Sequence, residues 1–377
     1  MGKSVFQAYR YTKPRRVERT PILRHEGEKV IKFGEKCELL RTVMFPPPPD
    51  SVSQSQMSDS HALPWPDITS LEIKEAIFSS NPNKAPGPDG MTFLNLQQAY
   101  MAVPWLFDLI YRSLLIVGYH PHCWREGIGA ILKKGNKPDY TTPKAYRVIV
   151  LLNCLGKVSE KIIAKRLSYL SEANQLLHMQ QMGGRRQRTA IDAAMALTHD
   201  IQCAKNVKRI TSVLFLDVKG AFDHVSKERL IQVLRQMTLP PPLLSWVRNF
   251  LSERRLGLAF DGEREAMTPI DTGIPQGSPT SPILFILYLR YHFDTLNERH
   301  PRVKVPSYID DIALTVEGNT EGENSRELEK AAKTAFDWAT NNAVAFDETK
   351  TELIHFSTKR TPNTDLKHPS RVLTERS

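Results

Sequence analysis

The chain has 377 residues with 51 Lys and Arg against 41 Asp and Glu, and this net charge of +10 favours a polyanionic partner. Its hydrophobic fraction of 41% and charged fraction of 24% are those of a globular protein, and its length allows a large core spread over two subdomains. The four cysteines form no CxxC pair and no apolar run approaches ~20 residues, which argues against a zinc site, a disulfide framework and a membrane span.

The N-terminal segment, residues 1 to about 45, is basic and weakly periodic. This composition fits a solvated, partly disordered extension as well as a nucleic-acid-binding arm. Phe45–Pro49 and the Ser-rich stretch 51–60 predict a stiff and then a flexible linker. We therefore expect the folded body to begin near Trp65.

The first element of that body is a short helix, opened by the capping box Thr69–Glu72 and ended by Asn81-Pro82. Lys84–Gly90 (KAPGPDG) then predicts a rigid loop that carries a cation. Apolar periodicity predicts further helices over residues 101–118, 156–173, 189 onward, 283–291 and 325–341. Apolar runs of strand length predict strands over residues 127–132, 146–153, 210–218, 256–260, 265–269 and 353–356.

Three aspartates occupy unusual places in this pattern. Asp217 ends an almost continuous apolar strand, where a carboxylate must be paired, hydrogen-bonded or bound to a metal. Asp310 and Asp311 are expected at the tight turn of a hairpin formed by residues 305–309 and 312–316. Adjacent like charges raise the free energy of both groups unless a cation neutralises them. An ordinary Asp-rich turn is the alternative interpretation of Tyr308–Asp311. Asp223 could cap the helix that follows it.

Several cations and glycines accompany these acids. Arg147, at the start of a buried strand, suits phosphate binding but could also be an edge charge. Arg185–Arg188 follow two glycines at a helix N-terminus, where they could bind a backbone phosphate or remain solvated. The loop at residues 273–282 (GIPQGSPTSP) lacks the GK[ST] of a P-loop, but its glycines let backbone approach a ligand closely.

The order of these motifs resembles the reverse transcriptases of non-LTR (LINE-type) retrotransposons, in detail those of fungal elements. The resemblance covers about Asp67 to Phe356. It rests on the blocks KAPGPDG, AYRVIVLLN, GGRRQRTAIDAA, FLDVKGAFDHV, GIPQGSPTSPILF, YIDD and TKTELIHF, which occur in this order.

The resemblance implies a right-hand polymerase fold of the α+β class, with fingers and an antiparallel palm sheet packed on helices. We expect an extension and linker over residues 1–63, a fingers-type region over 64–205, a palm-type catalytic region over 206–357 and a polar basic tail over 358–377. Full-length family proteins also carry an N-terminal endonuclease and a thumb, so we expect a fragment in which the thumb is largely missing.

The resemblance also implies a role for each matching residue. Asp217 and Asp310 match the metal-binding aspartates, and Asp311 matches the second of the paired acids, as a supporting ligand. Two Mg²⁺ ions are the expected cofactors, with Mn²⁺ as an alternative. Lys350 matches the lysine proposed to protonate the leaving pyrophosphate.

The dNTP-binding positions follow from the same blocks. Arg147 matches the triphosphate-binding arginine, and either Lys133 or Lys134 matches its lysine partner. Phe222 matches the bulky side chain that blocks a 2′-hydroxyl, and Gln276–Gly277 match the loop that packs on the incoming nucleotide and template. Val148 stands where the family usually has proline, which relaxes the local backbone and could weaken nucleotide binding.

The implied function is an RNA-directed DNA polymerase whose partners are an RNA template, a DNA primer and dNTPs. Arg185, Arg186 and Arg188 are expected to track the template–primer backbone. A catalytically silent remnant that keeps the fold and binds nucleic acid is the alternative. A metal-dependent nuclease is disfavoured because the Phe222 and Gln276 blocks serve a nucleotide. The lifestyle of such elements makes an intracellular, nuclear location our expectation.

Overall fold

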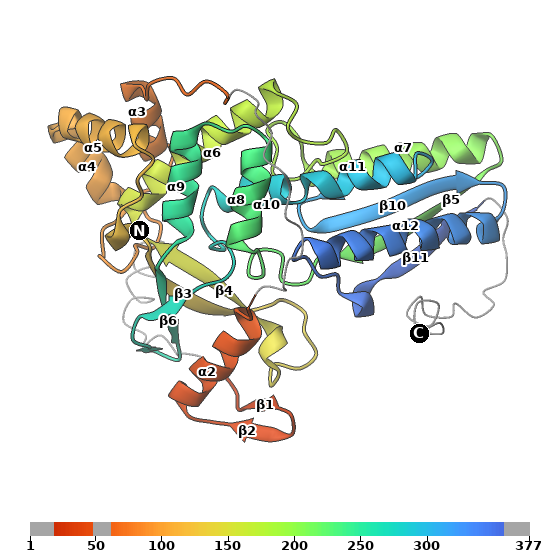
Figure 1. Cartoon of the computed structure of the whole chain (residues 1–377). Coiled ribbons are helices and arrows are strands. Elements are labelled where there is room, and N and C mark those ends of the chain that lie inside the picture. Colours follow the sequence, from red (N-terminus) through yellow and green to blue (C-terminus); the bar gives the residue numbers. More distant parts are fainter. Residues whose placement is uncertain (1–18, 48–61, 358–377) are drawn as a thin grey trace, which may run out of the picture.

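In the computed structural model, which describes residues 19–47 and 62–357, the apolar run at residues 210–218 forms the strand β5 (Ile210–Asp217) (Figure 1). β5 is an inner strand of an antiparallel sheet in the order β11-β5-β10-β9. The other strands are β9 (Ser307–Tyr308), β10 (Asp311–Gly318) and β11 (Glu352–Phe356). This sheet lies in the right-hand part of Figure 1 and carries all three aspartates at one end.

Helix α12 (Glu321–Asn341) packs on β5 and β10 and contacts α11 (Arg290–Arg299). Its buried face repeats at helical spacing, with Leu328, Ala331, Ala335 and Ala339 all fully or almost fully buried. Small alanines allow α12 to approach the sheet closely. Helix α7 (Ala190–Asn206) leads into β5 and contacts it, with Ala204 as its buried residue.

A second sheet has the order β4-β3-β6-β7, with β8 paired to β6. β3 (Glu126–Lys133) runs antiparallel to β4 (Tyr146–Leu152) and parallel to β6 (Arg254–Phe260), while β7 (Glu263–Arg264) and β8 (Thr268–Ile270) complete it. Strands β6 to β8 lie within the expected palm-type region, residues 206–357, yet pair with the sheet of the expected fingers-type region.

Helices surround the large core, which also includes buried residues of β5 and β10. The core includes Trp246, Tyr111, Phe93 and Phe285, all fully buried. The helices are α3 (Ser70–Phe78), α4 (Phe93–Ala102), α5 (Pro104–Ile116), α6 (Cys154–Ala173), α8 (Lys227–Gln236), α9 (Pro241–Leu251) and α10 (Ser281–Tyr288). Single turns of 3₁₀ helix lie at η1 (His122–Trp124), η2 (Pro143–Ala145) and η3 (Glu348–Lys350).

The structure confirms the mixed α and β class and most of the predicted elements. The capping box at Thr69 is formed by both of its reciprocal hydrogen bonds. The helix predicted over residues 101–118 is confirmed as α5, which begins at Pro104, a first-turn position where proline is tolerated. The preceding helix α4 was not predicted.

The expected extension is also wrong for residues 19–47. These residues form the hairpin of β1 (Leu23–His25) and β2 (Glu28–Val30) and the helix α2 (Phe33–Met44). They share a smaller hydrophobic core with β4 and β6, in which Leu23 and Leu40 are fully buried. The most basic part of the expected nucleic-acid arm, residues 1–18, and most of the expected linker lie outside the described residues.

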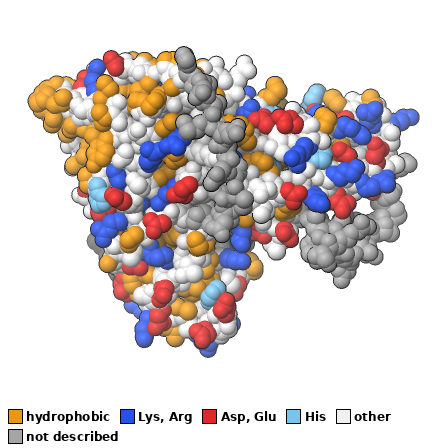
Figure 2. Space-filling model, viewed as in Figure 1, with side chains coloured by type: hydrophobic (Ala, Val, Ile, Leu, Met, Phe, Trp, Pro, Cys, Tyr) orange, Lys and Arg blue, Asp and Glu red, His pale blue; other side chains and the backbone are white. Residues whose placement is uncertain are grey.

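Hydrophobic side chains are exposed on α4 and α5, where they gather in the upper left of Figure 2. Met101, Trp105, Leu109 and Ile116 are each more than half exposed. Within residues 19–47 and 62–357, no single helix is long and apolar enough to cross a membrane; α4 and α5 meet that requirement only as a pair bent by 110°.

The packing of α2 predicts the effect of a core truncation. We expect Leu40→Ala to lower the free energy of unfolding by about 2–5 kcal/mol, because the lost methyl groups leave a cavity under α2. Ile31→Ala, at a side chain that is 60% exposed, is the control and should change it by less than about 0.5 kcal/mol. Denaturant unfolding of both variants measures this, and equal effects would contradict the packed position of α2.

Candidate active site

The three aspartates are brought together by strand register. β10 runs antiparallel to β5 so that Asp311 pairs directly with Asp217, and β9 pairs Tyr308 with the same Asp311. Asp310 lies in the two-residue turn between β9 and β10, after Ile309 in a left-handed conformation with φ of 60°. The hairpin prediction is confirmed, but Asp311 belongs to the strand and not to the turn, because pairing with β5 extends to it.

This register places like charges on one face of the sheet. Residues directly opposite in an antiparallel pair share a face, with their Cβ atoms about 5 Å apart, and like charges there are destabilising. Burial raises the pKa of Asp310, and the charges of Asp311 and Asp217 raise it further. Burial and the charge of Asp217 likewise raise the pKa of Asp311. The site therefore favours a cation.

Lys350 supplies one positive charge. Its Nζ lies 2.6 Å from Asp217 Oδ2 and 3.5 Å from Asp347 Oδ2. Burial alone would lower the pKa of Lys350, but its bonds to these two carboxylates raise it. Asp347 also donates its backbone N–H to the Asp217 carbonyl at 2.8 Å, which fixes the 3₁₀ turn η3 at the end of β5. The predicted proximity of Lys350 to the aspartates is thus seen directly.

The expected triphosphate-binding cations lie on β3 and β4. The two strands pair Leu132 with Arg147, which is exposed, and the Lys134 N–H donates to the Ala145 carbonyl at 2.8 Å. The two candidate lysines differ in their surroundings. Burial and the charge of Lys350 lower the pKa of Lys134, and Asp217 and Asp223 oppose this, so Lys134 lies in the field of the acidic site.

Lys133 contacts an aromatic ring. Its Nζ lies 5.6 Å from the centre of the Tyr140 ring, at cation–π distance. The geometry therefore favours Lys134 over Lys133 as the lysine beside the aspartates, a choice that the sequence left open.

The loop over residues 273–282 joins the segment of Phe222 to β4. Ile274 N–H donates to the Phe222 carbonyl at 2.7 Å, and Val150 N–H donates to the Gln276 carbonyl at 2.8 Å. A Cβ at Gly277, where φ is 122°, would lie 2.7 Å from the Val150 carbonyl oxygen. Only glycine fits this close approach. Phe222 packs on Phe285 with ring centres 5.4 Å apart.

Arg254, which the sequence did not single out, is hydrogen-bonded to the start of this loop. Its buried guanidinium donates to the carbonyls of Thr272 and Gly273, and Thr272 Oγ1 donates to the Asp223 carbonyl at 3.1 Å. A charged residue at the start of an otherwise apolar strand was the available signal, but the pattern predicts a strand that begins only at residue 256.

Asp223 does not cap the following helix, as the sequence had suggested, because the N-cap of α8 is Ser226. Burial raises the pKa of Asp223 to about 7, against the opposing charges of Arg254 and Lys134. Asp223 thus lies in the electrostatic field of both Arg254, which bonds the loop, and Lys134.

The glycine–arginine loop supports the hairpin. A Cβ at Gly183 would lie 2.3 Å from the Ile309 nitrogen, so this glycine allows the loop to pack against the turn that carries Asp310. Arg185 bonds both oxygens of Glu172 at 2.6 and 2.5 Å. Its guanidinium also donates to the carbonyls of His178 and Gln181. The expected nucleic-acid contact is therefore not supported for Arg185.

The two neighbouring arginines differ from Arg185. Arg188 donates to the Met179 carbonyl at 2.9 Å, and Arg186 is exposed. A contact between these two arginines and nucleic acid remains a prediction.

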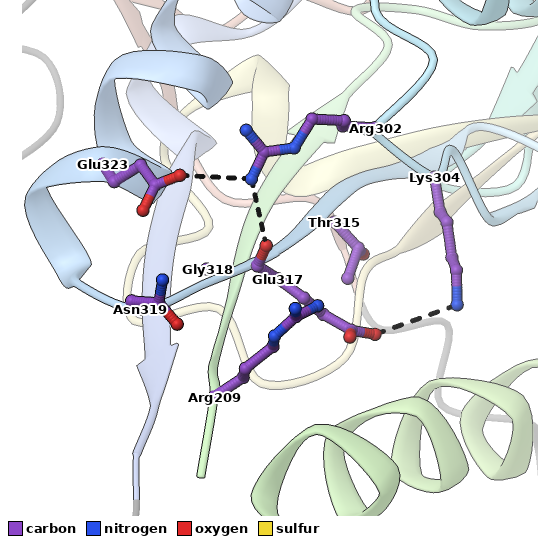
Figure 3. A pocket seen from close by; sticks show the side chains of 8 residues that line it. All are labelled: Arg209, Arg302, Lys304, Thr315, Glu317, Gly318, Asn319 and Glu323. Atoms are coloured by element: carbon purple, nitrogen blue, oxygen red, sulfur yellow. Dashed lines mark hydrogen bonds and ion pairs between the residues drawn. The ribbon is translucent and has the colours of Figure 1, made fainter. Parts of the chain in front are cut away.

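A hollow lies away from the aspartates, at the opposite end of β5 and β10 (Figure 3). Its volume is about 500 Å³. Arg302 lies 3.2 Å from Glu323, and Lys304 lies 3.9 Å from Glu317, so two of its three cations already have acidic partners. Its position and its paired charges do not suit the chemistry expected at Asp217.

The donor set suits a divalent cation in chemical type. Mg²⁺ prefers carboxylate oxygens and leaves positions for substrate phosphates, and the repulsion among Asp217, Asp310 and Asp311 would be relieved by such an ion. In the part of the chain that the structure describes, however, no group of three or more His, Cys, Asp or Glu side chains is arranged to hold a metal ion. Lys350 instead bonds Asp217.

The comparisons with known proteins identify the family of the chain. Residues 131–372 match the family model described as reverse transcriptase (RNA-dependent DNA polymerase). The chain belongs to the reverse transcriptase family.

The similar proteins come from transposons and other mobile elements. The chain is 26% identical over 311 residues to the probable RNA-directed DNA polymerase from transposon X-element of Drosophila melanogaster, which covers 82% of the chain and 34% of the relative. It is 27% identical to the RNA-directed DNA polymerase from mobile element jockey of Drosophila funebris, over 94% of the chain and 40% of that protein. The chain thus spans about a third of the length of such relatives.

These matches identify a reverse transcriptase domain of the non-LTR retrotransposon type. A protein of the type-1 retrotransposable element R1DM of Drosophila melanogaster is also similar, with 27% identity over 79% of the chain. The finer resemblance to fungal elements is not supported by these relatives, which come from insects.

A buried acid lies beneath the loop of this reverse transcriptase domain. Thr280 Oγ1 donates to the Glu160 carbonyl at 2.9 Å, and the Glu160 side chain on α6 is fully buried. Burial raises the pKa of Glu160 from 4.5 to about 7, while Ser278 and Lys157 oppose the shift. Between pH 4.5 and about pH 7, Glu160 therefore stays protonated in the folded chain but is ionised in the unfolded chain.

This proton predicts a pH-dependent stability. Because the folded state binds the extra proton, wild-type stability should fall relative to Glu160→Gln as pH rises from about 4.5 to about 7, by about 3 kcal/mol in total. Denaturant unfolding at a series of pH values measures the difference. Glu329→Gln, at an exposed position, is the control. A difference between wild type and Glu160→Gln that does not change with pH would contradict the assignment.

Proposed function

We propose that this chain is the polymerising domain of an RNA-directed DNA polymerase, which adds dNTPs to a primer 3′-hydroxyl. The observation that carries the proposal is the pairing of Asp217 with Asp311 beside the turn of Asp310, in a chain of the reverse transcriptase family. Family membership implies the use of divalent metal ions in general, and Mg²⁺ is the ion that suits these ligands best.

The fold supports a palm and fingers arrangement. We assign the sheet β11-β5-β10-β9 with its helices to the palm, and the sheet β4-β3-β6 with α3 to α6 to the fingers. Strands β6 to β8 go with the fingers, and residues 19–47 pack on that same sheet.

Each residue of the site has a role in this proposal. Asp217, Asp310 and Asp311 would hold two Mg²⁺ ions. These ions would neutralise the negative charge on the attacking and the leaving oxygens. Lys134, which lies in the electrostatic field of Asp217, and the exposed Arg147 on β4 would offset the charge of the triphosphate. Lys350 lies where it can donate a proton to the leaving group.

The neighbouring loop would form the nucleotide pocket. Phe222 limits the space beside the sugar, and its position is fixed by Ile274 and by Phe285. The backbone of Gln276 and Gly277, which packs against Val150 of β4, would form another wall of this pocket. Polymerisation onto genomic DNA takes place where the genome is, so we also propose that the protein acts in the nucleus.

A catalytically silent, nucleic-acid-binding domain is the second candidate. The ion pair of Lys350 with Asp217 favours it, since this bond occupies a carboxylate that the metal would need. Primer extension separates the two functions.

We expect the chain, given Mg²⁺, an RNA template, a DNA primer and dNTPs, to extend the primer. Asp310→Asn should lower the rate at least about a hundredfold, because it removes a metal-binding charge worth several kcal/mol in the transition state. Asp337→Asn, at an exposed position on α12, is the matched control and should leave the rate unchanged. A wild type as inert as Asp310→Asn on every template would favour the silent domain.

Sugar selection gives a second test. Phe222→Ala should raise the ratio of ribonucleotide to deoxyribonucleotide incorporation about tenfold or more, because a truncated side chain admits the 2′-hydroxyl. Phe222→Tyr keeps the bulk and should keep the preference for dNTPs. The measured quantity is the ratio of kcat/KM for the two substrates. If the alanine variant kept the wild-type ratio, Phe222 would not select the sugar.

A further inference from the structure

A small hollow of about 20 Å³ is lined by Asp223, the neighbour of Phe222, and by residues 272–275, where the loop over residues 273–282 begins. Apolar side chains of β4, β6 and β8 make up most of its other walls. None of the three aspartates of the candidate active site lines it. Charged groups beside such apolar walls are costly unless they are paired.

Four charged side chains line this hollow, and two of them have partners of opposite charge. Arg125 Nη1 lies 3.5 Å from a carboxylate oxygen of Glu253. Arg255 Nη1 lies 3.6 Å from a carboxylate oxygen of Glu126. The other two charges in the lining, one acidic and one basic, are therefore the ones that remain to be balanced.

These two groups are Asp223 and Arg254, and each lacks a hydrogen bond. Arg254 Nη2 donates to the carbonyls of Thr272 and Gly273, but its buried Nε has no hydrogen-bond partner among residues 19–47 and 62–357. In the same part of the chain, the carboxylate of Asp223 has neither a hydrogen bond nor an ion pair. A donor and an acceptor without partners thus line one hollow.

The charges of Asp223 and Arg254 act on each other. Burial raises the pKa of Asp223 and lowers the pKa of Arg254, and the charge of each group opposes this shift in the other. A cavity of about 10–15 Å³ or more can hold a water molecule if polar partners are present. This hollow therefore has room for one water that accepts from Arg254 Nε and donates to the Asp223 carboxylate.

The backbone on both sides of this pair fixes Phe222. Ile274 N–H donates to the Phe222 carbonyl at 2.7 Å, and a Cβ at Gly273 would lie 2.6 Å from the Asp223 carbonyl oxygen. Arg254 bonds the loop side of this contact, and Asp223 belongs to the other side. A bond between their side chains would hold the two sides together.

We propose that Asp223 is a positioning residue that bonds Arg254 through one buried water molecule and thereby holds Phe222 where it excludes a 2′-hydroxyl. The proposal rests on the polymerase function proposed above. Asp223 itself does not contact the sugar in this account, and it acts through the backbone of Phe222. Without the carboxylate, the segment of Phe222 is held less firmly and the space beside the sugar widens.

The first test measures sugar selection in Asp223→Asn, which removes the charge at nearly constant volume. We expect the ratio of kcat/KM for ribonucleotide to that for deoxyribonucleotide to rise about fivefold, mainly through a lower KM for the ribonucleotide. This is less than the effect expected of Phe222→Ala, because the ring is retained. Asp271→Asn is the matched control: its charge also acts on Arg254, but its side chain is 94% exposed, and the ratio should not change.

The pH dependence of the same ratio is a readout that a loss of stability would not reproduce. The pKa of Asp223 is about 7, so its charge is present above this pH and is lost as pH falls through it. In the wild type, the ratio should therefore rise by most of the same factor between pH 8 and pH 6. In Asp223→Asn it should stay constant. Arg254 and Lys134, whose charges act on Asp223, are present in both proteins.

Thermal unfolding tests the pairing without catalysis. We expect the midpoint shifts of Asp223→Asn and Arg254→Gln at pH 8 to be non-additive, because each single variant leaves the other group without its partner. The double variant should shift the midpoint by less than the sum of the two single shifts. Asp271→Asn combined with Arg254→Gln is the control, and its shifts should add.

An unchanged ratio in Asp223→Asn, the same ratio in Asp223→Asn and Asp271→Asn, or additive thermal shifts for Asp223 and Arg254 would overturn the proposal. A wild type that never extends a primer, but shows non-additive shifts, would contradict the polymerase function and with it the role in sugar selection. The pairing of Asp223 with Arg254 would then still stand.

Discussion

The pairing of Asp217 with Asp311 across β5 and β10 is the constraint on which the site depends. Backbone hydrogen bonds set this register, and the apolar face of the sheet, buried under α12, prevents a slip by one residue. The fold thereby holds carboxylates together against their repulsion. Lys350 offsets part of that charge, and a divalent cation with substrate phosphates would complete the balance.

Around this pair, the structure fixes loops by backbone contacts that need particular residues. Gly183 lies against the turn of Asp310, and Gly277 lies against Val150 on β4. Arg254 bonds two carbonyls of the loop that carries Gln276. The catalytic sheet and the second sheet are thus tied together through the segment that would contact the nucleotide, so changes in either sheet reach the pocket.

Local patterns in the sequence predicted what depends on neighbours in the chain. The apolar run that ends at Asp217, the capping box at Thr69 and the hairpin of Asp310 all follow from short-range rules. The pairing of Asp217 with Asp311 was suggested by family resemblance and not by spacing. What the sequence did not predict depended on distant contacts: Arg185 finds Glu172 only in the fold, and residues 19–47 become ordered elements because β4 and β6 offer them an apolar surface.

The most direct measurement is the thermal midpoint of unfolding as a function of Mg²⁺ concentration, without nucleotide or nucleic acid. If the three aspartates share a cation, Mg²⁺ should raise the midpoint of the wild type and of Asp337→Asn, because an ion that binds the folded state stabilises it. The double variant Asp310→Asn with Asp311→Asn should start from a higher midpoint, since its repulsion is removed, and should not respond to Mg²⁺. The same Mg²⁺ response in all three proteins would contradict a metal site at this pair.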